Sequence, residues 1–136
     1  MNMSIPKQTR ILSILSLLGM GLVLLTRLVR PNLVDPMPWV GFVFGVMPNF
    51  GAGLGIPGVL FTVVNGYMKS QGREISASKA IILATFISEI GLFGWEFLGY
   101  FFWKLPIDPV DLLATLLGGT IALGLGLGSR AVISNE

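Results

Sequence analysis

The chain has 136 residues, of which 53% are hydrophobic and only 12% are charged, and its formal net charge is +2. Soluble domains carry about 25% charged residues, so this composition excludes an ordinary water-soluble domain and favours an α-helical membrane protein. The apolar runs are continuous rather than alternating, which disfavours a membrane β-barrel. The small net charge gives no reason to expect nucleic acid as a partner.

The chain contains neither cysteine nor histidine. Disulfides and thiolate metal sites therefore cannot form, and the commonest metal ligand and general base is missing. Neither a Ser-His-Asp nor a Cys-His catalytic set can be assembled. Residues 53–58 match G-x-G-x-x-G, but no strand precedes them, so they do not indicate a nucleotide site. We expect a protein that is not an enzyme and that has no cofactor and no metal.

Four apolar stretches predict an all-α integral membrane protein with four transmembrane helices, built as a single membrane domain over residues 1–136. A membrane-spanning helix takes about 20 apolar residues. Lys7 and Arg10 resemble the basic start of a signal peptide, but no A-x-A cleavage motif follows them, so we expect an uncleaved first span. The predicted spans are residues 11–29, 55–68, 80–102 and 110–128.

The second apolar block, residues 39–68, is too long for one simple helix, and Pro48, Pro57 and several glycines interrupt it. We predict that residues 40–46 form an interfacial or re-entrant segment and that the second span begins at Gly55. Irregular backbone at membrane depth is tolerated only where protein buries it or where it lines water. The break is therefore either an interfacial loop or a discontinuous element of the kind found at transporter sites.

The basic residues favour a cytoplasmic location for both termini, because cytoplasmic loops carry more Lys and Arg. With four spans, the termini and residues 69–79 share one side of the membrane. That side carries six basic residues and the other carries three: Lys7, Arg10, Lys69, Arg73, Lys79 and Arg130, against Arg27, Arg30 and Lys104.

Two glutamates, Glu89 and Glu96, lie in the third predicted span, seven residues apart and so on one helical face, with Thr85 four residues before Glu89. A carboxyl group at that depth is costly and is a functional candidate by default. The pair could bind a cation, relay a proton or anchor a cationic ligand, or could hydrogen-bond neighbouring helices. Because Glu89 lies near the bilayer centre, we expect it to be neutral and hydrogen-bonded, with Thr120 or Asn65 as its partner.

Asp108 and Asp111 flank Pro109 at the start of the fourth predicted span. Asp108 can cap this helix with Pro109 at its first position, and Asp111 then lies in the first turn, where the helix dipole favours a carboxylate. With Glu96 nearby, the two aspartates could instead form an acidic cluster that suits a divalent cation or a cationic head group.

Small residues follow Asp111 at spacings of three and four along the fourth span. They predict a face on which another helix can pack closely. We also expect Thr115 to lie at a depth similar to that of Glu96 and to contact it, and Asn49 to lie in a loop on the non-cytoplasmic side. The predicted packing residues are Gly118, Ala122 and Gly126, and the predicted ligand- or partner-binding residues are Glu89, Glu96, Asp108, Asp111, Thr115 and Asn49.

Residues 107–119, IDPVDLLATLLGG, resemble the D-x-x-D-L signature that opens the last helix of VanZ-like proteins, and Glu89 and Glu96 resemble the acidic or amide position of that family's third helix. VanZ-like proteins are small polytopic membrane proteins, one branch of which is linked to teicoplanin resistance. The resemblance covers residues 80–128. It implies a protein of the bacterial inner membrane that acts at the cell envelope, without naming a reaction.

Three functions are compatible with these features. The first is a VanZ-like protein whose acidic face binds a polar or cationic ligand, a lipid or a partner. The second is a non-catalytic subunit of a larger membrane complex. The third is a small ion-coupled carrier that acts as an oligomer, because one bundle of this size encloses little cavity. In all three cases we expect the protein to contact the lipid bilayer and not to bind nucleic acid.

Overall fold

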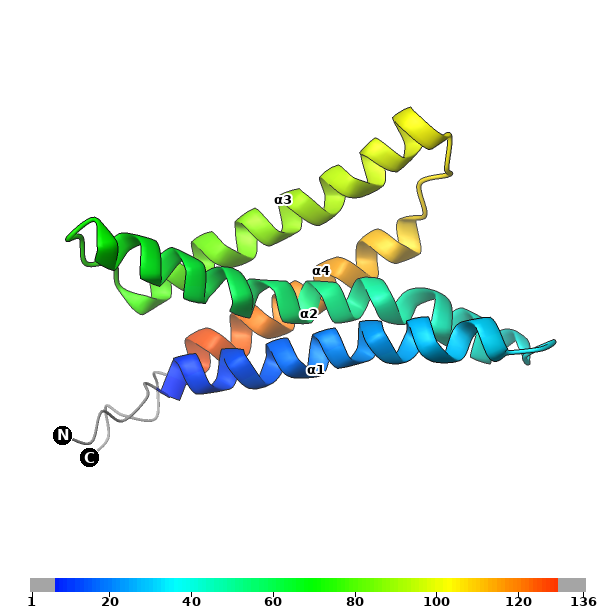
Figure 1. The fold of residues 1–136 in the computed structure, drawn as a ribbon, viewed down its shortest axis with the longest axis horizontal. Helices are drawn as coiled ribbons and strands as arrows, with labels where there is room; N and C mark the ends of the chain where they lie inside the picture. The colour runs from blue at the N-terminus through cyan, green and yellow to red at the C-terminus, as the bar shows by residue number, and fades with distance from the viewer. Residues whose placement is uncertain (1–6, 130–136) are drawn as a thin grey trace.

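A computed structural model describes residues 7–129 of the chain as a bundle of four helices (Figure 1). All four are long and apolar enough to cross a membrane, which confirms the prediction of an all-α protein with four such helices. A short 3-10 helix, η1 (Arg30–Asn32), follows the first of them. The helices are α1 (Lys7–Val29), α2 (Pro38–Ser70), α3 (Ala77–Trp103) and α4 (Pro109–Gly128).

The predicted break in the second apolar block is wrong. Residues 40–46 are not a separate segment, the second span does not begin at Gly55, and Asn49 does not lie in a loop. The helix α2 runs through all of them as one helix of 33 residues with Pro48 and Pro57 inside it. Each proline removes one backbone hydrogen bond, which neighbouring helices can tolerate in a membrane. At 1.5 Å per residue α2 is about 50 Å long, more than the ~30 Å of a bilayer core, so it must tilt or project beyond the core.

The glycines of α2 are packing residues rather than breakers. A Cβ atom at Gly51 or Gly55 would meet the backbone of Gly19 on α1, and one at Gly58 would meet the backbone of Leu12. On another side of α2, a Cβ at Gly53 would meet the carbonyl of Thr115 on α4. These contacts let α1 and α4 lie directly against α2, as small residues do at membrane helix interfaces.

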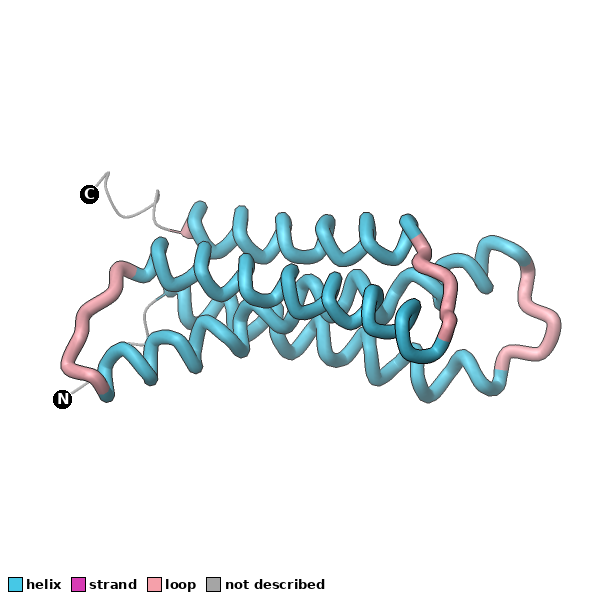
Figure 2. The backbone as a smooth tube through the Cα atoms, turned by 90° about the horizontal axis from the view of Figure 1, so that it is seen from above, coloured by secondary structure: helices cyan, strands magenta, loops and turns pink. Residues whose placement is uncertain are grey.

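The helix α3 lies against the bundle over its first half and then diverges from it (Figure 1). The loops that join the helices lie toward the two ends of the bundle (Figure 2). Its buried residues are Ala80, Ile81, Ala84, Thr85 and Ser88, followed only by Gly99. Added Cβ atoms at Gly91 and Gly94 would meet nothing within 4 Å. The second half of α3 is therefore packed less closely than the first, and open space lies beside Gly91 and Gly94.

Hydrogen bonds and backbone conformation at the helix ends define where α3 begins and ends. The hydroxyl of Ser76 accepts a hydrogen bond from the backbone N–H of Lys79 and caps α3. At the other end of α3, Lys104 adopts the left-handed conformation with φ 56°, and Leu105 N–H donates to the carbonyl of Gly99. A residue in the left-handed conformation ends many helices, and here it turns the chain toward α4.

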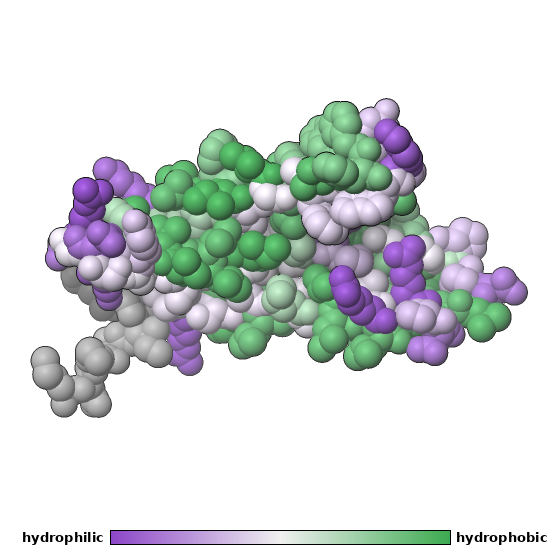
Figure 3. Space-filling view, turned by 45° about the horizontal axis from the view of Figure 1, so that its top comes forward, coloured by the Kyte–Doolittle hydropathy of each residue, from purple (hydrophilic) through white to green (hydrophobic). Residues whose placement is uncertain are grey.

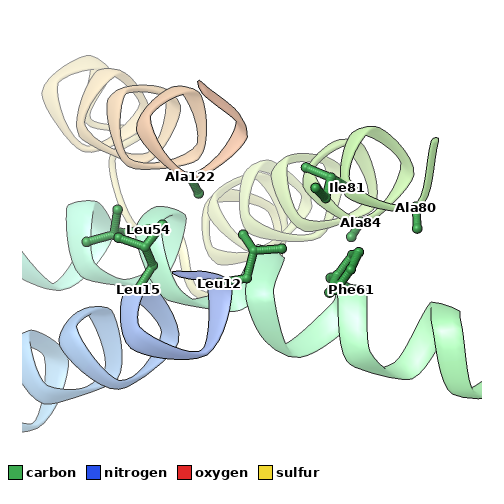
Figure 4. Packing of buried hydrophobic residues seen from close by; sticks show 8 residues of the cluster. All are labelled: Leu12, Leu15, Leu54, Phe61, Ala80, Ile81, Ala84 and Ala122. Carbon is green, nitrogen blue, oxygen red and sulfur yellow. The ribbon is translucent and has the colours of Figure 1, made fainter. Parts of the chain in front are cut away.

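The buried core is small and its side chains come from all four helices (Figure 4). Most large apolar side chains are instead exposed, such as Leu17, Phe86 and Leu116. Figure 3 shows hydrophobic side chains over the middle of one face and hydrophilic ones toward its two ends. This distribution is that of a protein whose middle contacts lipid rather than water. The core residues are Leu12, Leu15, Leu54, Phe61, Ala80, Ile81, Ala84 and Ala122.

The two ends of the bundle differ in the segments they gather (Figure 1). One end holds the start of α1, the end of α4 and the connection between α2 and α3. The opposite end holds η1 and residues 104–108, and we refer to it as the η1 end. Arg130, one of the six basic residues assigned to the cytoplasmic side, lies outside the described residues.

Candidate functional site

A pocket of about 390 Å³ lies at the η1 end between η1, α2 and α4. Arg30 brings a positive charge to it, and Asp108 and Asp111 bring two negative charges. Phe42 and Val46 of α2 provide apolar contact on the same pocket. We call it the η1 pocket. It combines charges of both signs with an apolar wall, at the end of the membrane-spanning helices.

The fold places both aspartates through the start of α4. Asp108 is the N-cap, and its Oδ1 accepts a hydrogen bond of 2.8 Å from the N–H of Val110, with Pro109 in the first turn. Asp111 lies in that first turn and is half-buried. Asp108 therefore performs the predicted capping through one oxygen, and its second oxygen remains available to a ligand.

Glu96 projects from the diverging half of α3 and is half-buried. It lies within electrostatic range of Asp111 and Asp108, so the acidic groups predicted to be near one another do share the η1 end. Within residues 7–129, no three carboxylates come together in a group that could hold a metal ion. A dedicated divalent-cation site is therefore not supported by the geometry of this cluster.

Thr115 and Asn49 lie away from the η1 pocket. Thr115 is 4% exposed and packs against Gly53 of α2. Its hydroxyl donates to the carbonyl of Asp111 at 3.0 Å rather than to Glu96. Asn49 is half-buried within α2 and does not line the pocket.

The small residues of α4 face different neighbours. A Cβ at Gly118 would meet the backbone of Phe50 and Leu54 on α2, and Ala122 is fully buried in the core. Gly126 faces side chains of Ile81 and Leu12, at 3.3–3.4 Å from an added Cβ. This face of α4 thus packs against α2 near its middle and against α1 and α3 near its end.

A second pocket, of about 240 Å³, lies between α3 and α4 near the middle of the bundle. Glu89 lines it together with Thr85 of its own helix and Thr120 of α4, and the remaining wall is mainly apolar. The carboxyl group of Glu89 lies directly against Gly119, where any side chain would collide with Oε1. We call it the Glu89 pocket.

The predicted hydrogen bond of Glu89 is wrong. Both carboxyl oxygens are buried and neither has a hydrogen-bond partner. Thr120 lines the same pocket without bonding to them, and Asn65 lies elsewhere, in a pocket with Lys69, Arg73 and Glu74. The prediction assumed that a polar residue at similar depth would turn toward the carboxyl group. Instead, the carboxyl group faces Gly119 of α4, which has no side chain to donate.

Sequence reasoning missed two residues of these pockets. Arg30 entered the prediction only through membrane orientation. The four-span arrangement also puts it on the same side as the start of the fourth span, where Asp108 lies, and that was a signal that the two could be near each other. Gly119 was read only as part of the resemblance signature. Nothing in its local sequence says that it faces Glu89, because that depends on the rotation and the crossing of two helices.

No family model, no curated protein and no solved structure matches this chain. The fold and two of its pockets define the class: a small helical membrane protein with a pocket of mixed charge at the η1 end of its spans and a carboxyl-containing pocket at their middle.

Proposed function

We propose that this chain is a VanZ-like protein of the bacterial inner membrane that binds, in the η1 pocket, a lipid or lipid-linked head group carrying an amine and a phosphate. The observation that carries the proposal is the presence of Arg30 in one pocket with Asp108 and Asp111. A ligand with a single charge would leave one side of this pocket without a counter-charge, whereas a zwitterionic head group complements both.

The chemistry of each side chain supports this ligand. A guanidinium binds phosphate oxygens through paired N–H donors, so Arg30 suits the phosphate. Carboxylates accept hydrogen bonds from an ammonium, so Asp111 and the free oxygen of Asp108 suit the amine. Phe42 and Val46 would contact the apolar part next to the head group. The end of a membrane-spanning bundle is also the depth at which lipid head groups lie.

Both termini are proposed to lie in the cytoplasm, which leaves the η1 pocket on the outer side. The greater number of basic residues at the opposite end supports this orientation. Reporters fused after Glu136 and inserted within residues 71–76 should both report a cytoplasmic location. Opposite locations for the two reporters would contradict the four-span arrangement, and two external locations would invert it.

The head-group proposal predicts a preference for phosphatidylethanolamine over phosphatidylglycerol, because the second lipid has a phosphate but no amine. Arg30→Gln and Asp111→Asn should each weaken the binding of phosphatidylethanolamine about tenfold, since a hydrogen bond to a charged group is worth roughly 1.5–3 kcal/mol. Native mass spectrometry of the protein released from gentle detergent, titrated with each lipid, measures the bound fraction.

Two charges near the same end serve as matched controls for that experiment. Asp35 lies in the connection after η1 and Lys104 ends α3, and neither lines the η1 pocket. Asp35→Asn and Lys104→Met should therefore leave the preference unchanged. If the control variants lost as much phosphatidylethanolamine binding as the pocket variants, the effect would be a general electrostatic one and the proposal would be overturned. Equal binding of the two lipids by the wild-type protein would also overturn it.

A second candidate function is that of a non-catalytic subunit in a membrane complex. The observation that favours it is the diverging half of α3, which carries Glu96 and in which added Cβ atoms at Gly91 and Gly94 would meet nothing within 4 Å. A carboxyl group in such a position suits a contact with a partner helix. The same mass spectra discriminate: a fixed hetero-complex supports the subunit, and a monomer carrying lipid supports the head-group site.

A further inference from the structure

Three oxygen-bearing side chains line the Glu89 pocket, and those of Glu89 and Thr85 are unusual for a membrane interior. Both oxygens of the Glu89 carboxyl group and the hydroxyl of Thr85 are buried without a hydrogen-bond partner. Thr85 is only 7% exposed, so water does not satisfy it. On α4, the hydroxyl-bearing Thr120 lines the same pocket. Leaving a buried polar group unpaired is costly, so the three buried oxygens of Glu89 and Thr85 point to a missing partner.

Three threonines elsewhere in the helices strengthen this point. A threonine inside a helix can donate to the carbonyl four residues before it. Thr26, Thr62 and Thr115 all do so, with distances of 2.9, 3.2 and 3.0 Å. Thr85 makes no such bond. It lies one helical turn before Glu89 on the same face and lines the same pocket.

The charges around the pocket indicate what the partner is. Glu89 is the one ionisable residue among those that line it, and the described residues of the pocket include no lysine or arginine. Glu89 is one residue from the midpoint of α3 (Ala77–Trp103), where an ionised carboxyl group without a counter-charge is too costly. A bound cation would supply that charge, and hydrogen-bond donors would satisfy the carboxyl and hydroxyl oxygens together.

We propose that the Glu89 pocket binds the ammonium head of an apolar primary amine that enters from the lipid. A primary ammonium carries three N–H donors, and the side chains of Glu89, Thr85 and Thr120 offer oxygens in one pocket of about 240 Å³. Apolar side chains such as Ile82 and Leu116 form the rest of the wall and suit an alkyl chain. This site is distinct from the η1 pocket and does not depend on the function proposed for it.

Gly119 makes the site possible. It is buried on α4, and an added Cβ would collide with Oε1 of Glu89. The glycine therefore lets α4 lie against the carboxyl group without covering it by a side chain. A larger residue would push the carboxyl group away from Thr85 and Thr120 or fill the space that the ammonium needs.

The experiment compares two probes on the full chain in lipid nanodiscs: dodecylamine, which is cationic at neutral pH, and dodecanol, which has the same chain and no charge. A ligand at a hundredfold excess over its Kd stabilises the folded state, so dodecylamine should raise the Tm by several degrees and dodecanol should not. Glu89→Gln, which keeps the shape and removes the charge, should weaken dodecylamine binding at least tenfold.

Matched variants separate the site from its surroundings. Glu96→Gln removes the other carboxyl group of α3, lies outside this pocket and should keep the response to dodecylamine. If Glu89→Gln does not fold, Thr120→Val is the second test, because Thr120 is exposed and its replacement should leave the fold intact; it should weaken binding several-fold. Equal stabilisation by both probes, full binding by Glu89→Gln or by Thr120→Val, or no response of the wild-type protein would each overturn the proposal.

Discussion

Gly118→Leu should destabilise the protein strongly, lowering its Tm in detergent by roughly 10 °C or more. An added Cβ at this position already collides with the carbonyl of Phe50 and lies 2.7 Å from the backbone nitrogen of Leu54. Overpacking a well-packed interior costs about 1–3 kcal/mol and occasionally more, and here the obstacle is backbone that cannot rotate away. The measurement is thermal unfolding of the purified variant, followed by circular dichroism or by loss of the monodisperse species.

Gly124→Leu on the same helix is the matched control. An added Cβ at Gly124 meets nothing within 4 Å, so a leucine there should extend into lipid and change the Tm little. Both substitutions add the same side chain to the same helix and differ only in the face they occupy. If Gly124→Leu lowered the Tm more than Gly118→Leu, the rotation of α4 against α2 would be different from the one described.

Gly19→Leu should destabilise the protein about as strongly, because Gly19 of α1 packs against the other side of α2. An added Cβ at Gly19 would collide with the carbonyl of Gly51 and lie 2.7 Å from the backbone nitrogen of Gly55. Separating α1 from α2 would also break the hydrogen bond of 2.9 Å from the hydroxyl of Ser16 to the carbonyl of Gly55. We expect the free energy of unfolding to fall by about 3 kcal/mol, the upper end of the usual range for overpacking.

Gly21→Leu tests the same helix two residues further on, where an added Cβ meets nothing within 4 Å. It should retain nearly the stability of the wild type in the same thermal assay. If both α1 variants lost stability equally, the effect would come from the helix itself or from its insertion into the membrane, and the close α1–α2 contact would not be its cause.

The break predicted in α2 shows how a local pattern can be misread. Pro48, Pro57 and the glycines between them disfavour a helix in isolation, and the prediction followed that preference. Gly51 and Gly55 are four residues apart, however, which is the spacing of a close helix contact in membranes. The same residues that weaken the helix alone allow α1 and α4 to pack directly on it, and this packing keeps α2 continuous.

The candidate sites were predictable to different extents. Asp108 and Asp111 could be placed at the start of α4 because capping depends only on neighbouring residues. Glu89 could be recognised as exceptional because its cost depends only on depth. Its surroundings could not be derived, because the absence of a donor beside it results from the approach of Gly119 rather than from any property of α3 itself.

The sequence by itself determined that this is a helical membrane protein with four spans, and it determined which carboxyl groups would be costly to bury. These properties follow from composition, from length and from the alternation of apolar and polar stretches, and they do not depend on which helices are neighbours. Only the tertiary structure decided that Arg30 shares a pocket with Asp108 and Asp111, that α3 diverges, and that Glu89 and Thr85 are buried without partners. Each of these depends on the rotation of one helix against another, which backbone-to-backbone contacts at a few glycines set.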